Sequence, residues 1–347
     1  MKNKISVIGN YAENMISLNG QTVKTRIFYD ELKKTNLYDI NLLDTCGWKS
    51  NPIKLYKSIN RACKNDDFVF MMNDYKGVIV LSKLLPRFVK KSNCKLVYVV
   101  IGGWIYDFLK SHPKYITNLC QFDAIICETQ TLKTDLQSLG LENLFVVPNF
   151  KRLDVVESLL PVAKYPYRFC TFSRIFKEKG IEDAVECIKS INRKYDNDIV
   201  TLDIYGQIEE NYKSRFKELE KDFPKYIRYK GTVDYDKSVD TLKNYYALLF
   251  PTTYYAECHA GTVIDAFASG LPVICYEWKY SKDLITHGIE GLVCKPGVEN
   301  LVKLVEEAIN DQDKMLQMRV NCVNKAKEYL PDVNIEKIIG ILMQLQK

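Results

Sequence analysis

The stretch YAECHAGTVIDAFASGLPVI, residues 255–274, carries the pattern that decides the fold. A short apolar run at 247–250 precedes it, and a small-residue turn at Ala260 and Gly261 leads into a helix. The helix ends at a Gly-Leu-Pro turn, and a second apolar run follows. The order strand, loop, helix, strand is typical of a parallel sheet with helical crossovers.

Two carboxylates lie across the junction between this loop and this helix. Glu257 is in the loop, and Asp265 is one turn inside the helix, so both can face a ligand held at the helix N-terminus. Free amides and the helix dipole favour a phosphate at that position. Carboxylates beside a phosphate site bind hydroxyls, so the stretch indicates a sugar nucleotide as ligand.

The same alternation runs through the whole chain and predicts two α/β halves. Helical segments such as 181–193, 212–221 and 298–310 separate short apolar runs. We expect strands at 5–8, 39–43, 68–71, 96–101, 124–127 and 144–147, and then at 168–172, 200–205, 227–229, 247–250, 273–276 and 292–294. Prolines interrupt the pattern between 148 and 166, which places a domain boundary near 158/159. Two such domains would form a cleft between strand ends, where doubly wound folds bind ligands.

Composition narrows the class of protein. The chain has 347 residues, 47% hydrophobic and 27% charged, as expected for two soluble domains. Its eleven scattered cysteines form no Cys-x-x-Cys pair, which predicts a reducing cytoplasm rather than a disulfide framework. The N-terminus lacks the apolar length of a signal peptide, and no apolar run is long enough to span a membrane.

Positive charge is concentrated in the first half of the chain. Residues 1–160 contain 22 Lys and Arg against 15 Asp and Glu, and residues 75–106 contain no acid. Within 76–95, apolar residues fall beside the cations at helical spacing, which predicts a peripheral contact with an anionic membrane. A half-buried helix with a solvated face is the alternative. Nucleic acid is not expected, since the basic stretch lacks interleaved aromatics and no binding motif is present.

The loop at 173–180 carries two cations after the first strand of the second half. Arg174 can bind a diphosphate in bidentate fashion, and Lys179 can bind it as a point charge. The alternative is a solvated charged loop with Glu178 as partner. A capping box is the alternative for Asp265, with Thr262 as the N-cap.

Further candidates lie at other expected strand ends. His259 could contact phosphate or a sugar hydroxyl, although a single His is more often structural. In the first half, Asn19 and Gly20 occupy the turn after the first strand. The run Gly102-Gly103-Trp104 ends a later strand, where the glycines allow close approach and Trp104 offers a stacking surface for a sugar; a plain tight turn explains it almost as well.

Two other kinds of site are not expected. The pairs Asp196/Asp198 and Asp234/Asp236 fall in turns and helix starts, so we predict no metal. Gly9 is not followed by the glycine pattern of a dinucleotide fingerprint.

Taken together, the motifs resemble those of family 4 glycosyltransferases, which are retaining enzymes of the GT-B fold. They occur in that family's order: Ser173-Arg174…Lys179-Gly180, Leu202-Asp-Ile-Tyr-Gly206, Tyr229-Lys230-Gly231-Thr-Val233, Glu257…Asp265, Gly270-Leu-Pro272-Val-Ile274 and Glu290-Gly291-Leu-Val, with weaker likeness at Asn19-Gly20 and Val147-Pro148-Asn149. The resemblance implies that 1–158 bind the acceptor, that 159–330 bind the nucleotide sugar, and that a C-terminal helix in 331–347 packs back on the first domain.

The resemblance also implies roles for individual residues. Arg174 and Lys179 would neutralise the diphosphate, Glu257 would hold the transferred sugar, and Asp265 would bind the ribose. Backbone near Gly206, Gly231 and Thr232 would border the base, and the donor site would include His259, Ala260, Gly261 and Thr262. The acceptor would meet Asn19, Gly20, Gly102, Gly103 and Trp104.

This chain departs from the family's pattern in three places. Asp265 stands where Glu is usual, and Cys258 and His259 replace the usual Gly and Phe, so the sugar is not identified. Gly102 and Gly103 stand where many members have a His.

The sequence thus predicts a metal-independent hexosyltransferase without a cofactor. Its donor would be UDP- or GDP-linked, and its acceptor a glycan, in particular one linked to polyprenyl diphosphate, as in capsule or exopolysaccharide synthesis. The protein would be cytoplasmic and peripheral at the inner membrane face. The alternatives are a sugar-nucleotide epimerase of the same fold, with Glu13, Asp107 and Glu128 as acid/base candidates, and a non-catalytic partner subunit.

Overall fold

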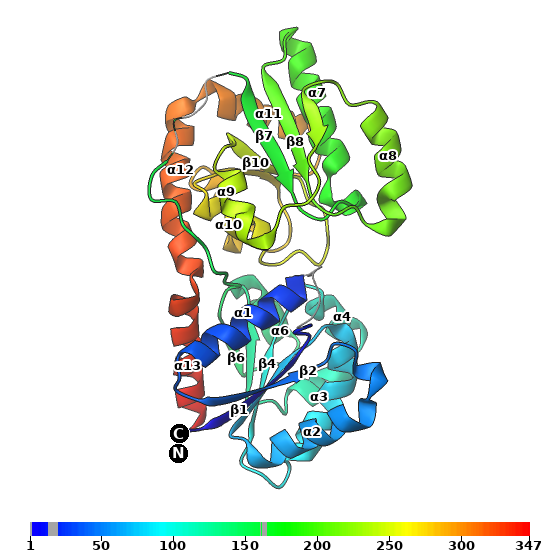
Figure 1. Ribbon diagram of the computed structural model, residues 1–347, viewed down its shortest axis with the longest axis vertical. Coiled ribbons are helices and arrows are strands. Elements are labelled where there is room, and N and C mark those ends of the chain that lie inside the picture. The colour runs from blue at the N-terminus through cyan, green and yellow to red at the C-terminus, as the bar shows by residue number, and fades with distance from the viewer. Residues whose placement is uncertain (1, 13–19, 160, 162–164) are drawn as a thin grey trace. The chain divides into compact units, whose positions relative to one another are not determined.

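The computed structural model describes residues 2–12, 20–159, 161 and 165–347, and it divides into two compact units. The first unit runs to Arg152 and resumes at Tyr329, and the second is Leu153–Glu328. The boundaries expected from the sequence, 158/159 and 330/331, lie slightly further along the chain. Figure 1 shows the helices and strands of both units.

The first unit is built on a six-stranded parallel sheet of order β2-β1-β3-β4-β5-β6. Its strands are β1 (Lys4–Gly9), β2 (Asp39–Asp44), β3 (Phe68–Met72), β4 (Lys95–Val99), β5 (Ala124–Cys127) and β6 (Leu144–Val146). Its helices are α1 (Gly20–Lys34), η1 (Trp48–Ser50), α2 (Pro52–Asn65), α3 (Tyr75–Val89), α4 (Ile105–Ser111), α5 (Lys114–Leu119), α6 (Gln130–Ser138) and α13 (Pro331–Leu345).

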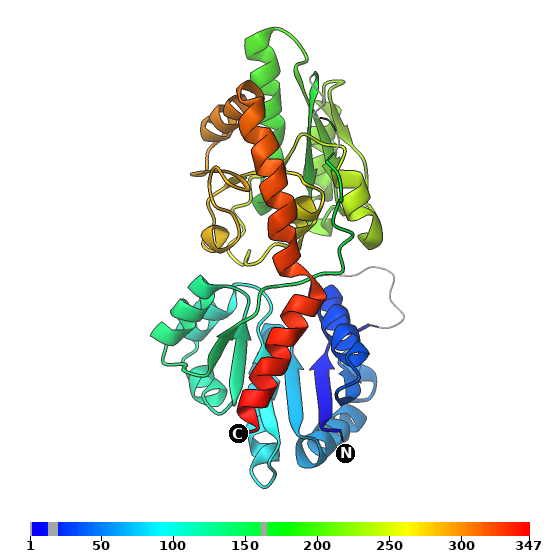
Figure 2. The same cartoon turned by 90° about the vertical axis from the view of Figure 1, so that its left-hand side faces the viewer.

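The C-terminal helix packs on this first sheet, as predicted. Ile338 and Leu342 of α13 share a buried core with Phe28 of α1 and with Phe70 and Val97 of the sheet. Figure 2 shows α13 running across the strands beside α1. The helices α2 and α3 belong to the opposite layer, since right-handed crossovers from β2 to β3 and from β3 to β4 pass over the other face.

The second unit has a six-stranded parallel sheet of order β12-β11-β10-β7-β8-β9. Its strands are β7 (Tyr167–Phe172), β8 (Val200–Tyr205), β9 (Ile227–Tyr229), β10 (Ala247–Phe250), β11 (Val273–Tyr276) and β12 (Gly291–Cys294). Its helices are η2 (Lys177–Lys179), α7 (Ile181–Tyr195), η3 (Glu210–Tyr212), α8 (Lys213–Lys221), η4 (Tyr235–Lys237), α9 (Ser238–Leu242), α10 (Gly261–Ala268), η5 (Ser281–Asp283), α11 (Val298–Asn310) and α12 (Gln312–Ala326), with η6 (Lys327–Tyr329) at the boundary.

The strand order of the second unit fixes where a ligand would bind. Counted from β7 to β12, it is the 3-2-1-4-5-6 order of a doubly wound nucleotide-binding fold. The order reverses between β7 and β10, and ligands of such sheets bind at the carboxyl ends of the strands beside this switch point. All twelve predicted strands are present, so the predicted α/β architecture is confirmed.

Candidate active site

The residues predicted to bind the diphosphate and the sugar directly follow the two strands of this switch point. Arg174 and Lys179 lie in the segment after β7, and Glu257 lies in the segment after β10. These strands are neighbours in the sheet and parallel, so their carboxyl ends meet at the same edge. The tertiary structure therefore brings together two motifs that are about 80 residues apart in the chain.

Backbone contacts join the two loops. The carbonyl oxygen of Glu178 accepts a hydrogen bond from the amide of Thr253 at 2.8 Å and another from Thr252 Oγ1 at 3.3 Å. Gly180 has a φ of +70°, and a Cβ there would overlap the carbonyl group of Pro251. Only glycine satisfies both the positive φ and this close approach.

Lys179 and Glu257 form an ion pair between these two loops. Lys179 Nζ donates to Glu257 Oε2, and the side chains are only 9% and 12% exposed. Thr252 Oγ1 is 3.5 Å from the same carboxylate oxygen. The ammonium group of Lys179 also lies over three aromatic rings, 5.3–5.7 Å from the centroids of Phe176, Phe250 and Tyr254. Rings around a cation fix its position and stabilise its charge.

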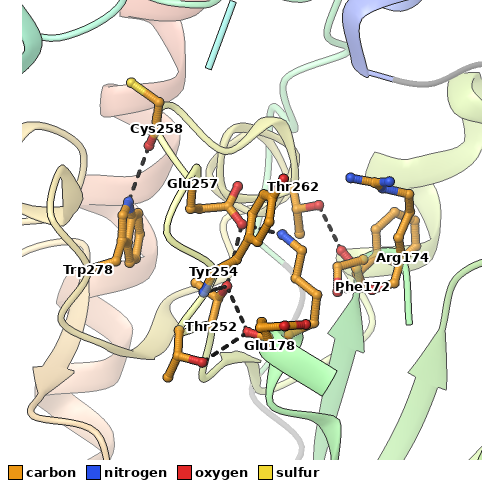
Figure 3. A network of polar contacts seen from close by, with 12 residues as sticks. Phe172, Arg174, Glu178, Thr252, Tyr254, Glu257, Cys258, Thr262 and Trp278 are labelled. Atoms are coloured by element: carbon orange, nitrogen blue, oxygen red, sulfur yellow. Dashed lines mark hydrogen bonds and ion pairs between the residues drawn. The ribbon is translucent and has the colours of Figure 1, made fainter. Parts of the chain in front are cut away.

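Arg174 lies at the open side of the same site. Its Nη1 donates to Glu209 Oε1 at 2.7 Å, its guanidinium carbon is 5.4 Å from the centroid of Phe176, and its side chain is 53% exposed. In Figure 3 the guanidinium of Arg174 and the carboxylate of Glu257 are seen on opposite sides of Thr262. An exposed guanidinium can exchange one carboxylate for a phosphate at little cost.

The N-terminus of α10 completes this part of the site. Ala260 is the N-cap, and its methyl side chain cannot accept a hydrogen bond, so no N-cap side chain covers the first helical amides, at Gly261 and Thr262. Thr262 is not the N-cap of a capping box: it is the second helical residue, and its Oγ1 donates to the carbonyl oxygen of Phe172 at 2.7 Å. Asp265 is therefore the fifth residue of the helix, where it is 3% exposed.

Residues at the ends of β8 and β9 lie next to the loop after β7. The amide of Gly206 donates to the carbonyl oxygen of Gly231 at 2.8 Å, and Tyr229 Oη donates to the carbonyl oxygen of Gly206 at 2.9 Å. Gly206 has a φ of +139°, and a Cβ there would overlap the carbonyl group of Ser173. Thr232 follows as an exposed residue.

The segment between Glu257 and α10 is packed into the unit. Cys258 is buried, and its carbonyl oxygen accepts a hydrogen bond from Trp278 Nε1 at 3.3 Å (Figure 3). His259 and Ala260 are also buried. Cys258 and His259, which stand where family 4 glycosyltransferases usually have Gly and Phe, are therefore packed inside the second unit and not exposed on the surface of the loop.

The first unit places its candidates at the carboxyl edge of its own sheet. Gly20 opens α1, and Gly102 and Gly103 follow β4, with Gly102 at a φ of +83°. Trp104 precedes α4, where its Nε1 donates to the carbonyl oxygen of Ile101 at 2.7 Å, and its ring contacts that of Tyr75 edge-on at 6.3 Å. Asn19 lies outside the described residues.

The aromatic surroundings of Lys179 were not predicted from the sequence. Phe176 and Tyr254 contribute two of the three rings, and Thr252 adds a hydroxyl beside Glu257. The signal was present, because Phe176 stands between Arg174 and Lys179 and a pair of tyrosines follows β10. Burial raises the pKa of Tyr254 above its usual value, so its hydroxyl is neutral at physiological pH.

Of the acid/base candidates for an epimerase, the two that the structure describes, Asp107 and Glu128, form no ion pair or hydrogen bond with each other. Glu128 is buried and accepts a hydrogen bond from Lys24 Nζ at 2.6 Å, whereas Asp107 is exposed on α4. Glu13 lies outside the described residues.

The Asp-x-Asp sequences include the C-cap of α7 at Asp196 and the N-cap of η4 at Asp234. Among the described residues, no group of three or more His, Cys, Asp and Glu side chains is arranged to hold a metal ion.

Comparisons with known proteins identify the domain of the second unit and the fold of the chain. Residues 160–329 match the model of the family described as "Glycosyl transferases group 1", so the second unit carries a glycosyltransferase group 1 domain. No curated protein sequence matches the chain at a significant level.

Solved structures of similar fold cover nearly the whole chain. Sucrose-phosphate synthase from Thermosynechococcus elongatus is 13% identical with a TM-score of 0.79, and each chain is 99% covered. HepE from Anabaena, solved with UDP and glucose, is 14% identical with a TM-score of 0.75, covering 99% of this chain and 100% of its own. The lipopolysaccharide outer core galactosyltransferase WaaB is 15% identical with a TM-score of 0.71, covering 98% and 99%. The GT-B fold predicted for the chain is confirmed.

Proposed function

We propose that this chain, whose second unit is a glycosyltransferase group 1 domain, is a retaining glycosyltransferase of the family 4 type. It moves a hexose from a UDP- or GDP-linked donor to a glycan acceptor, without a metal ion or another cofactor. One observation carries the proposal: at the switch point of the second sheet, Lys179 and Glu257 form a buried pair beside Arg174 and the N-terminus of α10.

Each group has a task in this proposal. Arg174, Lys179 and the first amides of α10 bind the diphosphate, because they are positive groups that lie together beside the switch point. Glu257 holds the hydroxyls of the transferred sugar, and Asp265 binds the ribose. Gly206, Gly231 and Thr232 border the base, and His259, Ala260, Gly261 and Thr262 form the wall next to the diphosphate.

The chemistry follows from where charge develops. When the bond between the sugar and the diphosphate breaks, negative charge grows on the phosphate oxygens and positive charge on the sugar ring. Fixed cations and amides stabilise the first, and the Glu257 carboxylate stabilises the second. Attack on the same face of the sugar retains its configuration, with the departing phosphate accepting the proton of the acceptor hydroxyl.

The first unit supplies the acceptor site in this proposal. Gly20, Gly102, Gly103 and Trp104 lie at the carboxyl edge of its sheet, and a half-exposed indole is a stacking surface for a sugar ring. WaaB, a protein of similar fold, is named for lipopolysaccharide outer core synthesis, which supports a cell-surface glycan as product. We propose a polyprenyl-diphosphate-linked glycan as acceptor, used at the cytoplasmic face of the membrane in capsule or exopolysaccharide synthesis.

Two rivals are less well supported. An epimerase needs a pair of acid/base groups, and Glu128 is instead held by Lys24. A non-catalytic subunit need not keep Arg174, Lys179 and Glu257 together.

The test is incubation with a panel of UDP- and GDP-sugars, with and without a lipid-linked glycan acceptor. We expect nucleotide release that depends on acceptor, together with a glycan product that is one sugar longer and has the donor's anomeric configuration. Epimerised donor without transfer would establish the epimerase, and nucleotide binding without turnover would indicate the partner subunit.

A further inference from the structure

The helices α2 and α3 of the first unit pack side by side and form one outer surface. The rings of Tyr56 on α2 and Phe88 on α3 meet edge-on at 5.2 Å, and Figure 1 shows the two helices as neighbours. Ile59 and Cys63 of α2, and Val78 and Leu85 of α3, are buried beneath them. The side chains on the other side of both helices therefore face away from the unit.

This outer surface is strongly cationic. Residues 45–65 and 75–94 contain no Asp or Glu. Ten cations on η1, α2, α3 and the turn after α3 are exposed: Lys49, Lys54, Lys57, Arg61, Lys64, Lys76, Lys83, Arg87, Lys90 and Lys91. None of the ten is ion-paired with another side chain in the part of the chain that the structure describes. The charge is therefore available to an anionic partner.

Large apolar side chains are exposed among these cations. Ile53 is 67% exposed, and Val80 and Trp48 are each 53% exposed. Helical spacing places Ile53 in line with Lys57, Arg61 and Lys64 on the outward side of α2, and Val80 in line with Lys76, Lys83 and Arg87 on that of α3. Cations interleaved with exposed aliphatic and indole groups suit an interface between water and lipid.

We propose that this α2–α3 surface docks on an anionic lipid bilayer, with Trp48, Ile53 and Val80 inserted among the headgroups and the cations on lipid phosphates. The sequence indicated only the segment 76–95; the tertiary structure adds α2 and η1 to the same surface. A soluble polyanion such as RNA would use the charge but would leave the apolar groups exposed. The inference rests on this surface alone and does not depend on sugar transfer.

One end of this surface lies at the same edge of the first sheet as the proposed acceptor residues. Trp48 follows β2 and Tyr75 follows β3, so the N-terminal ends of α2 and α3 lie at the carboxyl edge of the sheet. Gly102, Gly103 and Trp104, the proposed acceptor residues, follow β4 at the same edge. A bilayer bound by this surface would therefore hold a lipid-linked acceptor beside the edge that receives it.

The experiment is co-sedimentation of the full chain with vesicles of phosphatidylethanolamine and phosphatidylglycerol, compared with vesicles of phosphatidylcholine alone. We expect binding to the anionic vesicles only. The variant Lys57→Gln/Arg61→Gln/Lys64→Gln is expected to weaken binding about a hundredfold, from roughly fivefold per cation near a charged surface. Ile53→Ser is expected to weaken it by about tenfold, because it removes an inserted apolar group.

A matched control removes equal charge from the second unit. Lys217→Gln/Lys221→Gln/Lys225→Gln changes three exposed cations there and is expected to leave vesicle binding unchanged. The proposal is overturned if both triple variants bind equally well, or if the natural chain ignores anionic vesicles. It is also overturned if Ile53→Ser binds normally while heparin and RNA compete as well as lipid, since the partner is then a soluble polyanion. Transfer to a soluble acceptor, measured separately, distinguishes any of these results from failure of the proposed function.

Discussion

Replacing Lys179 with Met is expected to destabilise the second unit, because its partner Glu257 would remain nearly buried without a countercharge. The two side chains are 9% and 12% exposed. Removing one member of a buried ion pair typically costs about 3–5 kcal/mol. For a domain of this size, that corresponds to a fall in melting temperature of roughly 6–20 °C.

A double-mutant cycle separates the pair from its surroundings. Glu257→Gln alone is expected to destabilise by a similar amount, since Lys179 then keeps its charge among three rings. The double variant is expected to recover at least about 2 kcal/mol relative to the sum of the single changes, because no unpaired charge remains. Calorimetric unfolding of the three variants measures this coupling, and all three are expected to lose transfer by about 10²–10³-fold or more.

The control for this cycle is Lys177→Met. Lys177 lies in the same η2 turn and is exposed, so its loss is expected to change the melting temperature by little. If the single variants at 179 and 257 are as stable as this control, or if their effects add within about 0.5 kcal/mol, the reasoning from the buried pair is wrong.

Three further changes test other parts of the structure. Arg174→Ala is expected to lower transfer about 10²–10³-fold with little loss of stability, because the guanidinium is 53% exposed, and full transferase activity would contradict the assignment. Gly206→Ala is expected to destabilise by roughly 3 kcal/mol or more, because φ is +139° and a Cβ would overlap a backbone carbonyl; an unchanged urea midpoint would refute this. Burial opposes ionisation of Glu31, but hydrogen bonds from Lys34 and Arg152 hold its pKa below the usual 4.5. Its contribution to stability is therefore complete above pH 4.5 and is lost as the pH falls through the lowered pKa, so Glu31→Gln is expected to unfold with less dependence on pH there; equal pH profiles would count against the pairing.

The prediction of the fold succeeded because local patterns carried it. Each strand is a short apolar run bounded by turn residues, and each crossover helix has its own apolar periodicity. The sheet order is not written in any of these runs. The place of β10 next to β7, which creates the switch point, depends on pairing between segments far apart in the chain.

The interpretation of the helix start shows the limit of local reasoning. Thr262 and Asp265 have the spacing of a capping box, yet the helix begins earlier, at Gly261. Thr262 instead bonds to the carbonyl group of Phe172, a residue that no local pattern could identify. A tertiary partner decided between two uses of the same hydroxyl.

The sequence by itself determined the two α/β units, their strands, and an order of motifs that resembles family 4 glycosyltransferases. These follow from spacing and residue type, which act over a few residues. Only the tertiary structure decided that Lys179 is paired with Glu257 among three rings, and that α2 joins α3 in one cationic surface. The physical reason is the same in both cases: a charge is satisfied or left available by its neighbours in space, and parallel strand pairing brings together neighbours that are far apart in the chain.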